Sequence, residues 1–152
     1  MKKASFSLAI LVLIALTACG GGSDSNQTTE TGGGNQSTIN VTLNDIYYGD
    51  RNDNIDNPPT WMAQSGNTVT VQAQNNGVLE HNWAVVEANA SLPDSVTDPT
   101  AIEDLILFDI GEVAGGESWN SVFTAPAPGE YTVICTVAGH YPAMQGKLVV
   151  EE

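Results

Sequence analysis

The sequence has few of the residues on which most protein chemistry depends. Its 152 residues include two cysteines, two histidines, three methionines, and only four lysines and arginines against 18 acidic residues. The net charge of −14 argues against nucleic acid as a partner, because a phosphate backbone needs a basic protein surface. Two cysteines exclude a disulfide-dense scaffold and a four-thiolate zinc or iron–sulfur site. Two histidines exclude a site of three imidazoles, so any chemistry uses a short list of residues.

The first 18 residues have the pattern of an export signal. Two lysines follow Met1, an apolar run covers residues 4–15, and the segment leads into Leu16-Thr17-Ala18-Cys19. Such a run is too short for a membrane-spanning helix but is typical of a secretory signal peptide. The last four residues resemble the bacterial lipobox, in which cleavage before the cysteine leaves its thiol to be lipidated. We therefore expect residues 1–18 to be a lipoprotein signal peptide and Cys19 to carry lipid, with an ordinary signal peptide as the alternative.

Residues 19–37 are expected to be a flexible tether. They are rich in Gly, Ser, Thr, Asn and Gln, and such a segment cannot bury enough apolar surface to fold. A tether after a lipidated cysteine predicts an exported domain that is anchored to a membrane in the bacterial cell envelope or periplasm. Removal of residues 1–18 takes away Lys2 and Lys3 and no acidic residue, which changes the net charge from −14 to −16.

The remaining residues, 38–152, are predicted to form an all-β domain. Apolar and polar residues alternate over short runs, and turn residues such as Asn75-Asn76-Gly77 separate these runs. Six or more short strands in about 115 residues predict a β-sandwich or barrel. The segment 98–108 is ambiguous. Asp98 and Pro99 are typical of the start of a short helix, whereas residues 105–108 fit a strand equally well.

The scarce residues gather in two places. His81 opens a predicted strand within the compact apolar run 81–86, and Cys135, His140 and Met144 lie in one loop between predicted strands. One thiolate and two imidazoles in a near-trigonal arrangement, with a weak axial thioether, make a mononuclear copper site for electron transfer. Metal ligation would also protect Cys135, which is otherwise a lone thiol in an oxidising compartment. The sequence therefore predicts one copper ion held by these four residues.

Other interpretations of the same residues remain. Zinc accepts the thiolate and the imidazoles but does not favour a thioether. A Cys–His nucleophile pair, as in papain-like enzymes, leaves Met144 unused and exposes the thiol to oxidation outside the cell. Taken singly, each of the four residues is an ordinary core or strand residue. In that case the domain is a β-sandwich adhesion module without a metal.

The segments Glu80-His81-Asn82-Trp83 and 135–146 resemble those of the cupredoxins, the blue (type 1) copper proteins, and specifically the azurin and auracyanin group. The Cys-x4-His-x3-Met spacing is similar to azurin, whereas residues 126–131 and 139–142 are more similar to auracyanin. The resemblance covers residues 38–152 and implies a Greek-key, cupredoxin-like sandwich or barrel. It also implies equatorial copper ligation by His81, Cys135 and His140, with Met144 as the axial ligand.

The resemblance implies roles for three neighbouring residues. Asn82 and Thr136 match positions whose hydrogen bonds tie the two ligand segments together in azurin-like proteins, so we expect them to tune the potential and rigidity of the site. Azurin has glycine before its first histidine ligand, and the carbonyl group of that glycine approaches the copper. This chain has Glu80 there, so we expect a four-coordinate site.

The function that the resemblance implies is one-electron transfer without substrate chemistry, so the protein is not expected to be an enzyme. The electron would pass through the exposed edge of His140, with Tyr141, Pro142 and Ala143 as an apolar docking patch. The acidic surface favours a basic redox partner, by family analogy a c-type cytochrome or a respiratory or photosynthetic complex. We expect a monomer. A copper carrier or storage protein with the same ligands is the alternative.

Overall fold

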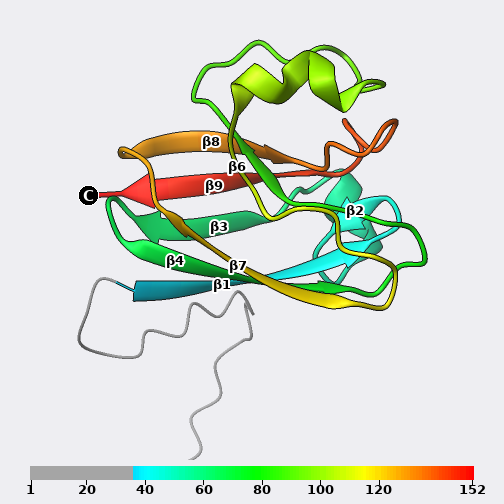
Figure 1. Cartoon of the computed structure of the whole chain (residues 1–152), viewed down its shortest axis with the longest axis horizontal. Coiled ribbons are helices and arrows are strands. Elements are labelled where there is room, and N and C mark those ends of the chain that lie inside the picture. Colours follow the sequence, from blue (N-terminus) through cyan, green and yellow to red (C-terminus); the bar gives the residue numbers. More distant parts are fainter. Residues whose placement is uncertain (1–35) are drawn as a thin grey trace, which may run out of the picture.

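The computed structural model describes residues 36–152, which form two β-sheets that pack against each other (Figure 1). The first sheet has the order β2-β1-β4-β7 and contains β1 (Gln36–Asn44), β2 (Tyr47–Tyr48), β4 (Thr68–Asn75) and β7 (Ser118–Thr124). The second has the order β3-β9-β8-β5-β6 and contains β3 (Thr60–Gln64), β5 (Ala84–Val86), β6 (Ile106–Asp109), β8 (Gly129–Ile134) and β9 (Gln145–Glu151). The predicted all-β fold is confirmed.

The strands form where apolar and polar residues alternate, because each strand turns one face toward the space between the sheets. In β4, Val69, Val71 and Ala73 are buried, whereas Gln72 and Gln74 are exposed. Two strand pairs, β1 with β4 and β3 with β9, are parallel, and the other neighbouring pairs are antiparallel. The parallel pairs join strands that are not adjacent in sequence, because the chain passes from β2 to β3 in the other sheet and returns to the first sheet at β4.

The ambiguous segment 98–108 contains both of the elements that its sequence allowed. Pro99–Leu105 is the 3₁₀ helix η2, and the Asp98 carboxylate caps it by accepting the N–H of Thr100 at 3.0 Å. The chain then enters β6 at Ile106. A second 3₁₀ helix, η1 (Asn52–Ile55), follows β2.

The start of β1 differs slightly from the expected domain boundary. Gln36 and Ser37 pair with Thr68 and Val69 of β4, so the fold begins two residues before the predicted start at 38. The expected signal peptide, the lipidation of Cys19 and the rest of the tether lie outside the described residues. Within the described part of the chain, no helix is long and apolar enough to cross a membrane.

Aromatic rings fill the core between the sheets. Trp61 lies between Tyr48 and Trp83 in edge-to-face contacts, with ring centroids 5.7 and 5.5 Å apart, and Phe108 stacks on Phe123. Trp83 is fully buried and follows His81 by two residues. The core therefore anchors the segment that carries one of the predicted metal ligands.

Candidate metal centre

Three of the four predicted ligand residues converge at the end of the sandwich where β8 ends and β9 begins. The ligand atoms of His81, Cys135 and His140 all lie within 4.8 Å of one another. Nδ1 of His140 is 3.1 Å from Nδ1 of His81 and 3.4 Å from Sγ of Cys135, and Sγ is 3.9 Å from Nδ1 of His81. His81 and Cys135 are fully buried, whereas His140 is partly exposed. The sulfur and the two nitrogens thus face a common point.

His81 is held by an isolated β-bridge and not by the strand that its sequence predicted. Its N–H donates to the carbonyl oxygen of Val113 at 3.1 Å, and the N–H of Val113 donates to its carbonyl oxygen at 2.7 Å. The strand β5 begins only at Ala84. The bridge fixes the backbone on both sides of the imidazole, which orients the ring toward Cys135.

The loop between β8 and β9 is closed by its own backbone hydrogen bonds. The N–H of Cys135 donates to the carbonyl of Met144 at 3.1 Å, and the N–H of Met144 donates to the carbonyl of His140 at 2.9 Å. The N–H of His140 in turn donates to the carbonyl of Val137 at 3.0 Å. Met144 is fully buried and belongs to the same core cluster as Cys135. This compact loop brings residues at positions 135, 140 and 144 to one end of the sandwich.

Asn82 connects the two segments that carry the converging residues. Its side-chain oxygen accepts the N–H of Thr136 at 2.8 Å, and its amide nitrogen donates to the hydroxyl of Thr136 at 2.7 Å. The same nitrogen donates to a carboxylate oxygen of Asp109 at 2.6 Å, and the Tyr48 hydroxyl donates to the Asn82 carbonyl at 2.8 Å. A buried side chain with so many partners is locked in one orientation. The positions of His81 and Cys135 are therefore coupled.

Burial controls the protonation of the metal-free site. It raises the pKa of the Cys135 thiol to about 11 and lowers the pKa of His81. Near neutral pH the metal-free centre thus contains a neutral thiol and a neutral buried imidazole. Because the thiolate is the ligand form of cysteine, metal binding must displace the thiol proton.

The residues predicted to form a docking patch differ in exposure. Pro142 is exposed, and His140, Tyr141 and Ala143 are partly exposed. Tyr141 also packs against a second core cluster, which contains Val86, Val96, Ile102 and Ile134. Part of the Tyr141 side chain is therefore used in packing and does not add to an open surface.

Sequence reasoning missed three residues around the centre. Val113 holds the backbone of His81, Asp109 accepts a hydrogen bond from Asn82, and Oδ1 of Asp45 lies 3.5 Å from Nε2 of His81. Each of these contacts joins segments that are distant in the chain. No local pattern marks such residues, since their positions follow from how the strands and loops pack together.

The donor set fits copper. Within the described residues, one buried thiol and two imidazoles form a group of three candidate ligands, one fewer than the four cysteine and histidine ligands of a closed zinc site. They match the His₂Cys set of a type 1 copper centre, in which a weak axial ligand completes the coordination.

Comparisons with known proteins agree with this donor set. The family model for copper-binding proteins of the plastocyanin/azurin family matches residues 51–151. Auracyanin-A of Chloroflexus aurantiacus is 38% identical over 158 aligned positions, covering 94% of each chain. The solved structure of auracyanin A, described as a "blue" copper protein of that bacterium, has a TM-score of 0.62 and 30% identity over 76% of this chain and 99% of its own. The copper-resistant cuproprotein CopI of Rubrivivax gelatinosus is 32% identical over 76% of this chain and 67% of its own length.

Proposed function

Because this chain belongs to the plastocyanin/azurin family of copper-binding proteins, we propose that it transfers single electrons through one copper ion held by His81, Cys135 and His140. Cupredoxins are generally electron-transfer proteins and not enzymes. The observation that carries the proposal is the convergence of one buried thiol and two imidazoles on a common point. A type 1 copper ion supplies a one-electron couple when it is bound.

The surrounding residues favour fast electron exchange by keeping the ligand geometry constant. The Asn82–Thr136 hydrogen bonds join the two ligand segments, and the Val113 bridge fixes the backbone of His81. A site that holds one geometry in both oxidation states has little to rearrange when the electron moves. Since His140 alone among the three converging residues is partly exposed, we assign the electron route to its edge.

We assign the axial position to Met144. Its spacing from His140, its complete burial and the hydrogen bond from Cys135 N–H to its carbonyl all support this role. Its thioether is a weak donor of the kind that occupies the axial position of type 1 sites. Glu80 replaces the glycine of azurin, and for this reason we propose that the site is four-coordinate.

The protein surface supports a basic redox partner. Within the described residues the only lysine and arginine side chains are Lys147 and Arg51, which pair with Glu130 and Asp53 respectively. Such a surface attracts a positively charged protein and raises its association rate at low salt. We propose a c-type cytochrome or a respiratory or photosynthetic complex as the electron donor or acceptor. We further propose that the protein is a periplasmic monomer and that lipid on Cys19 anchors it to the membrane.

A copper carrier is the second candidate, favoured by the similarity to the copper-resistant cuproprotein of Rubrivivax gelatinosus. The two functions differ in what leaves the site. An electron-transfer protein exchanges electrons rapidly and keeps its copper, whereas a carrier releases copper readily. The test measures the electron self-exchange rate by NMR line broadening and the rate of copper loss to a chelator in the same preparation. Self-exchange that is much faster than copper loss supports electron transfer, and the reverse order supports a carrier.

A further inference from the structure

We propose that Asp45 is the positioning residue of the centre: its carboxylate holds the proton of the His81 imidazole on Nε2 and thereby presents Nδ1 to the metal. The effect of Asp45 on the copper-loaded protein rests on the proposed function, whereas its effect on the His81 tautomer does not. The position of Asp45 in the sequence gives no indication of such a role.

The geometry around the His81 imidazole shows why it needs this residue. Nδ1 faces Cys135 and His140, whereas Nε2 is completely buried and has no hydrogen-bond partner among the described residues. Oδ1 of Asp45 lies 3.5 Å from Nε2, which is longer than a good hydrogen bond but within the range of charge attraction. Since buried polar atoms almost always find a partner, we assign this carboxylate oxygen as the one that attracts a proton on Nε2.

Asp45 is held in place by contacts of its own. It lies in the turn between β1 and β2, and its Oδ1 accepts the N–H groups of Val78 at 2.7 Å and Leu79 at 3.0 Å. These two bonds, that of Leu79 first, lower the pKa of the carboxyl group, so Asp45 is ionised at neutral pH. The carboxylate is thus oriented by the loop that leads into His81.

Two glycines make room for this arrangement. A Cβ atom on Gly77 would collide with Oδ1 of Asp45, and a Cβ atom on Gly115 would collide with the carbonyl group of Val78. Only a residue without a side chain at 77 lets the Asp45 turn approach this closely. The loop is therefore shaped to seat the carboxylate.

The consequence concerns the tautomer of His81. A neutral imidazole carries its proton on one nitrogen only, and a carboxylate facing Nε2 favours the proton there. Nδ1 then has a free lone pair that points toward Cys135 and His140. In the metal-free protein, His140 must be the donor in the 3.1 Å contact between the two Nδ1 atoms. Carboxylates that orient histidine ligands in this way also raise their basicity.

The first experiment uses the metal-free protein and does not depend on copper. Long-range ¹H–¹⁵N NMR reports which nitrogen of His81 is protonated. We expect the Nε2–H tautomer in the wild type and a mixture of both tautomers in Asp45→Ala. A wild-type His81 that is protonated on Nδ1 would overturn the inference, and so would an Asp45→Ala protein with an unchanged tautomer.

The second experiment measures the reduction potential of the copper-loaded protein, with Asp45→Asn as the main variant. Asparagine keeps an oxygen for the Val78 and Leu79 N–H groups but removes the negative charge that stabilises the higher oxidation state. We expect the Cu(I)/Cu(II) ratio at a fixed ambient potential to rise by up to about tenfold, which equals a shift of about 59 mV for a one-electron couple. Gly77→Ala displaces the carboxylate without changing the net charge, so it should shift the ratio in the same direction.

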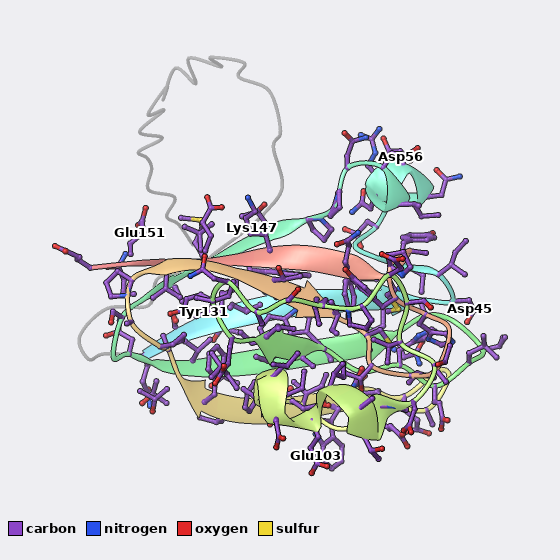
Figure 2. All side chains as sticks on the ribbon, turned by 90° about the horizontal axis from the view of Figure 1, so that it is seen from above. Asp45, Asp56, Glu103, Tyr131, Lys147 and Glu151 are labelled. Atoms are coloured by element: carbon purple, nitrogen blue, oxygen red, sulfur yellow. The ribbon has the colours of Figure 1, made fainter. Side chains whose placement is uncertain are left out.

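Glu151→Gln is the matched control. Like Asp45→Asn, it replaces a carboxylate by an amide. Figure 2 shows Glu151 and Asp45 at opposite ends of the sandwich. We expect the ratio to change by less than about 1.5-fold, because charges this far apart across solvent are screened. An effect of Asp45→Asn no larger than that of Glu151→Gln would overturn the inference. A wild-type protein without a copper–thiolate band would instead contradict the proposed function, and the tautomer measurement would still decide the role of Asp45.

Discussion

Asn82 and Thr136 are joined by two hydrogen bonds, one from the Thr136 N–H to the Asn82 side-chain oxygen at 2.8 Å and one from the Asn82 amide to the Thr136 hydroxyl at 2.7 Å. Asn82 directly follows His81, and Thr136 directly follows Cys135. The pair therefore sets the distance between a nitrogen and a sulfur that face the same point, and it does so without any metal.

Replacement of Asn82 tests this coupling. Asn82→Ala removes bonds to Thr136 and Asp109 and leaves the N–H of Thr136 without its partner. We expect the free energy of unfolding of the metal-free protein to fall by about 2–4 kcal/mol. Thr136→Val removes only the hydroxyl contact and should cost about 0.5–1.5 kcal/mol. Urea denaturation of both variants gives the comparison, and equal losses would show that the N–H bond adds little.

The Cys135 thiol should make the stability of the metal-free protein depend on pH. Its pKa is about 11 in the fold against an ordinary value of 9.0, so the native state binds this proton more tightly than the unfolded state does. The contribution is complete below pH 9 and is lost as the pH rises toward 11, at a rate of up to roughly 1.4 kcal/mol per pH unit.

Cys135→Ser is the control for this pH dependence. Burial also raises the pKa of Tyr48 well above its ordinary value, which gives a loss of the same sign at still higher pH. The difference between the wild type and the variant isolates the thiol. Two stability curves that stay parallel between pH 8 and pH 11 would contradict the assignment.

Gly146 should tolerate no side chain. A Cβ atom there would lie 2.5 Å from a ring carbon of Trp61 and 3.0 Å from the carbonyl oxygen of Pro59. We expect Gly146→Ala to lower the free energy of unfolding by about 1–3 kcal/mol, because an overpacked core must shift. In a Trp61→Phe background, Gly146→Ala should lower the free energy of unfolding by less than it does in the wild type. A strictly additive double mutant would show that the ring is not the obstacle.

The acidic surface should make electron transfer to a basic c-type cytochrome depend on salt. We expect the bimolecular rate to fall by about tenfold between roughly 10 mM and 200 mM ionic strength, because added salt screens the attraction. Stopped-flow mixing measures this rate, and an uncharged small-molecule reductant serves as the control. A cytochrome rate that does not change with ionic strength would exclude electrostatic steering.

Local patterns carried most of the information about the fold. Alternation of apolar and polar residues predicts β1 and β4, and Asp98 with Pro99 predicts the start of η2. The scarcity of cysteine and histidine singles out His81, Cys135 and His140 from the sequence alone. These predictions succeed because they depend on neighbours in the chain or on the chemistry of single residues.

Contacts between distant segments could not be predicted in the same way. The sequence suggested that His81 opens a strand, but an isolated bridge to Val113 holds it and β5 begins three residues later. Asp45 is a turn residue by every local criterion, and its approach to His81 depends on how the turn docks against the 77–79 loop. Pairings of this kind appear only when the two sheets are assembled.

Spectroelectrochemical titration of the copper-loaded protein tests the central claim most directly. The oxidised wild type should show an intense thiolate-to-copper band at about 600 nm, which bleaches and returns with one electron per protein while the copper stays bound. Cys135→Ser should lack the band. A colourless wild-type copper complex, or a band that is lost permanently as copper leaves on reduction, would contradict an electron-transfer centre at His81, Cys135 and His140.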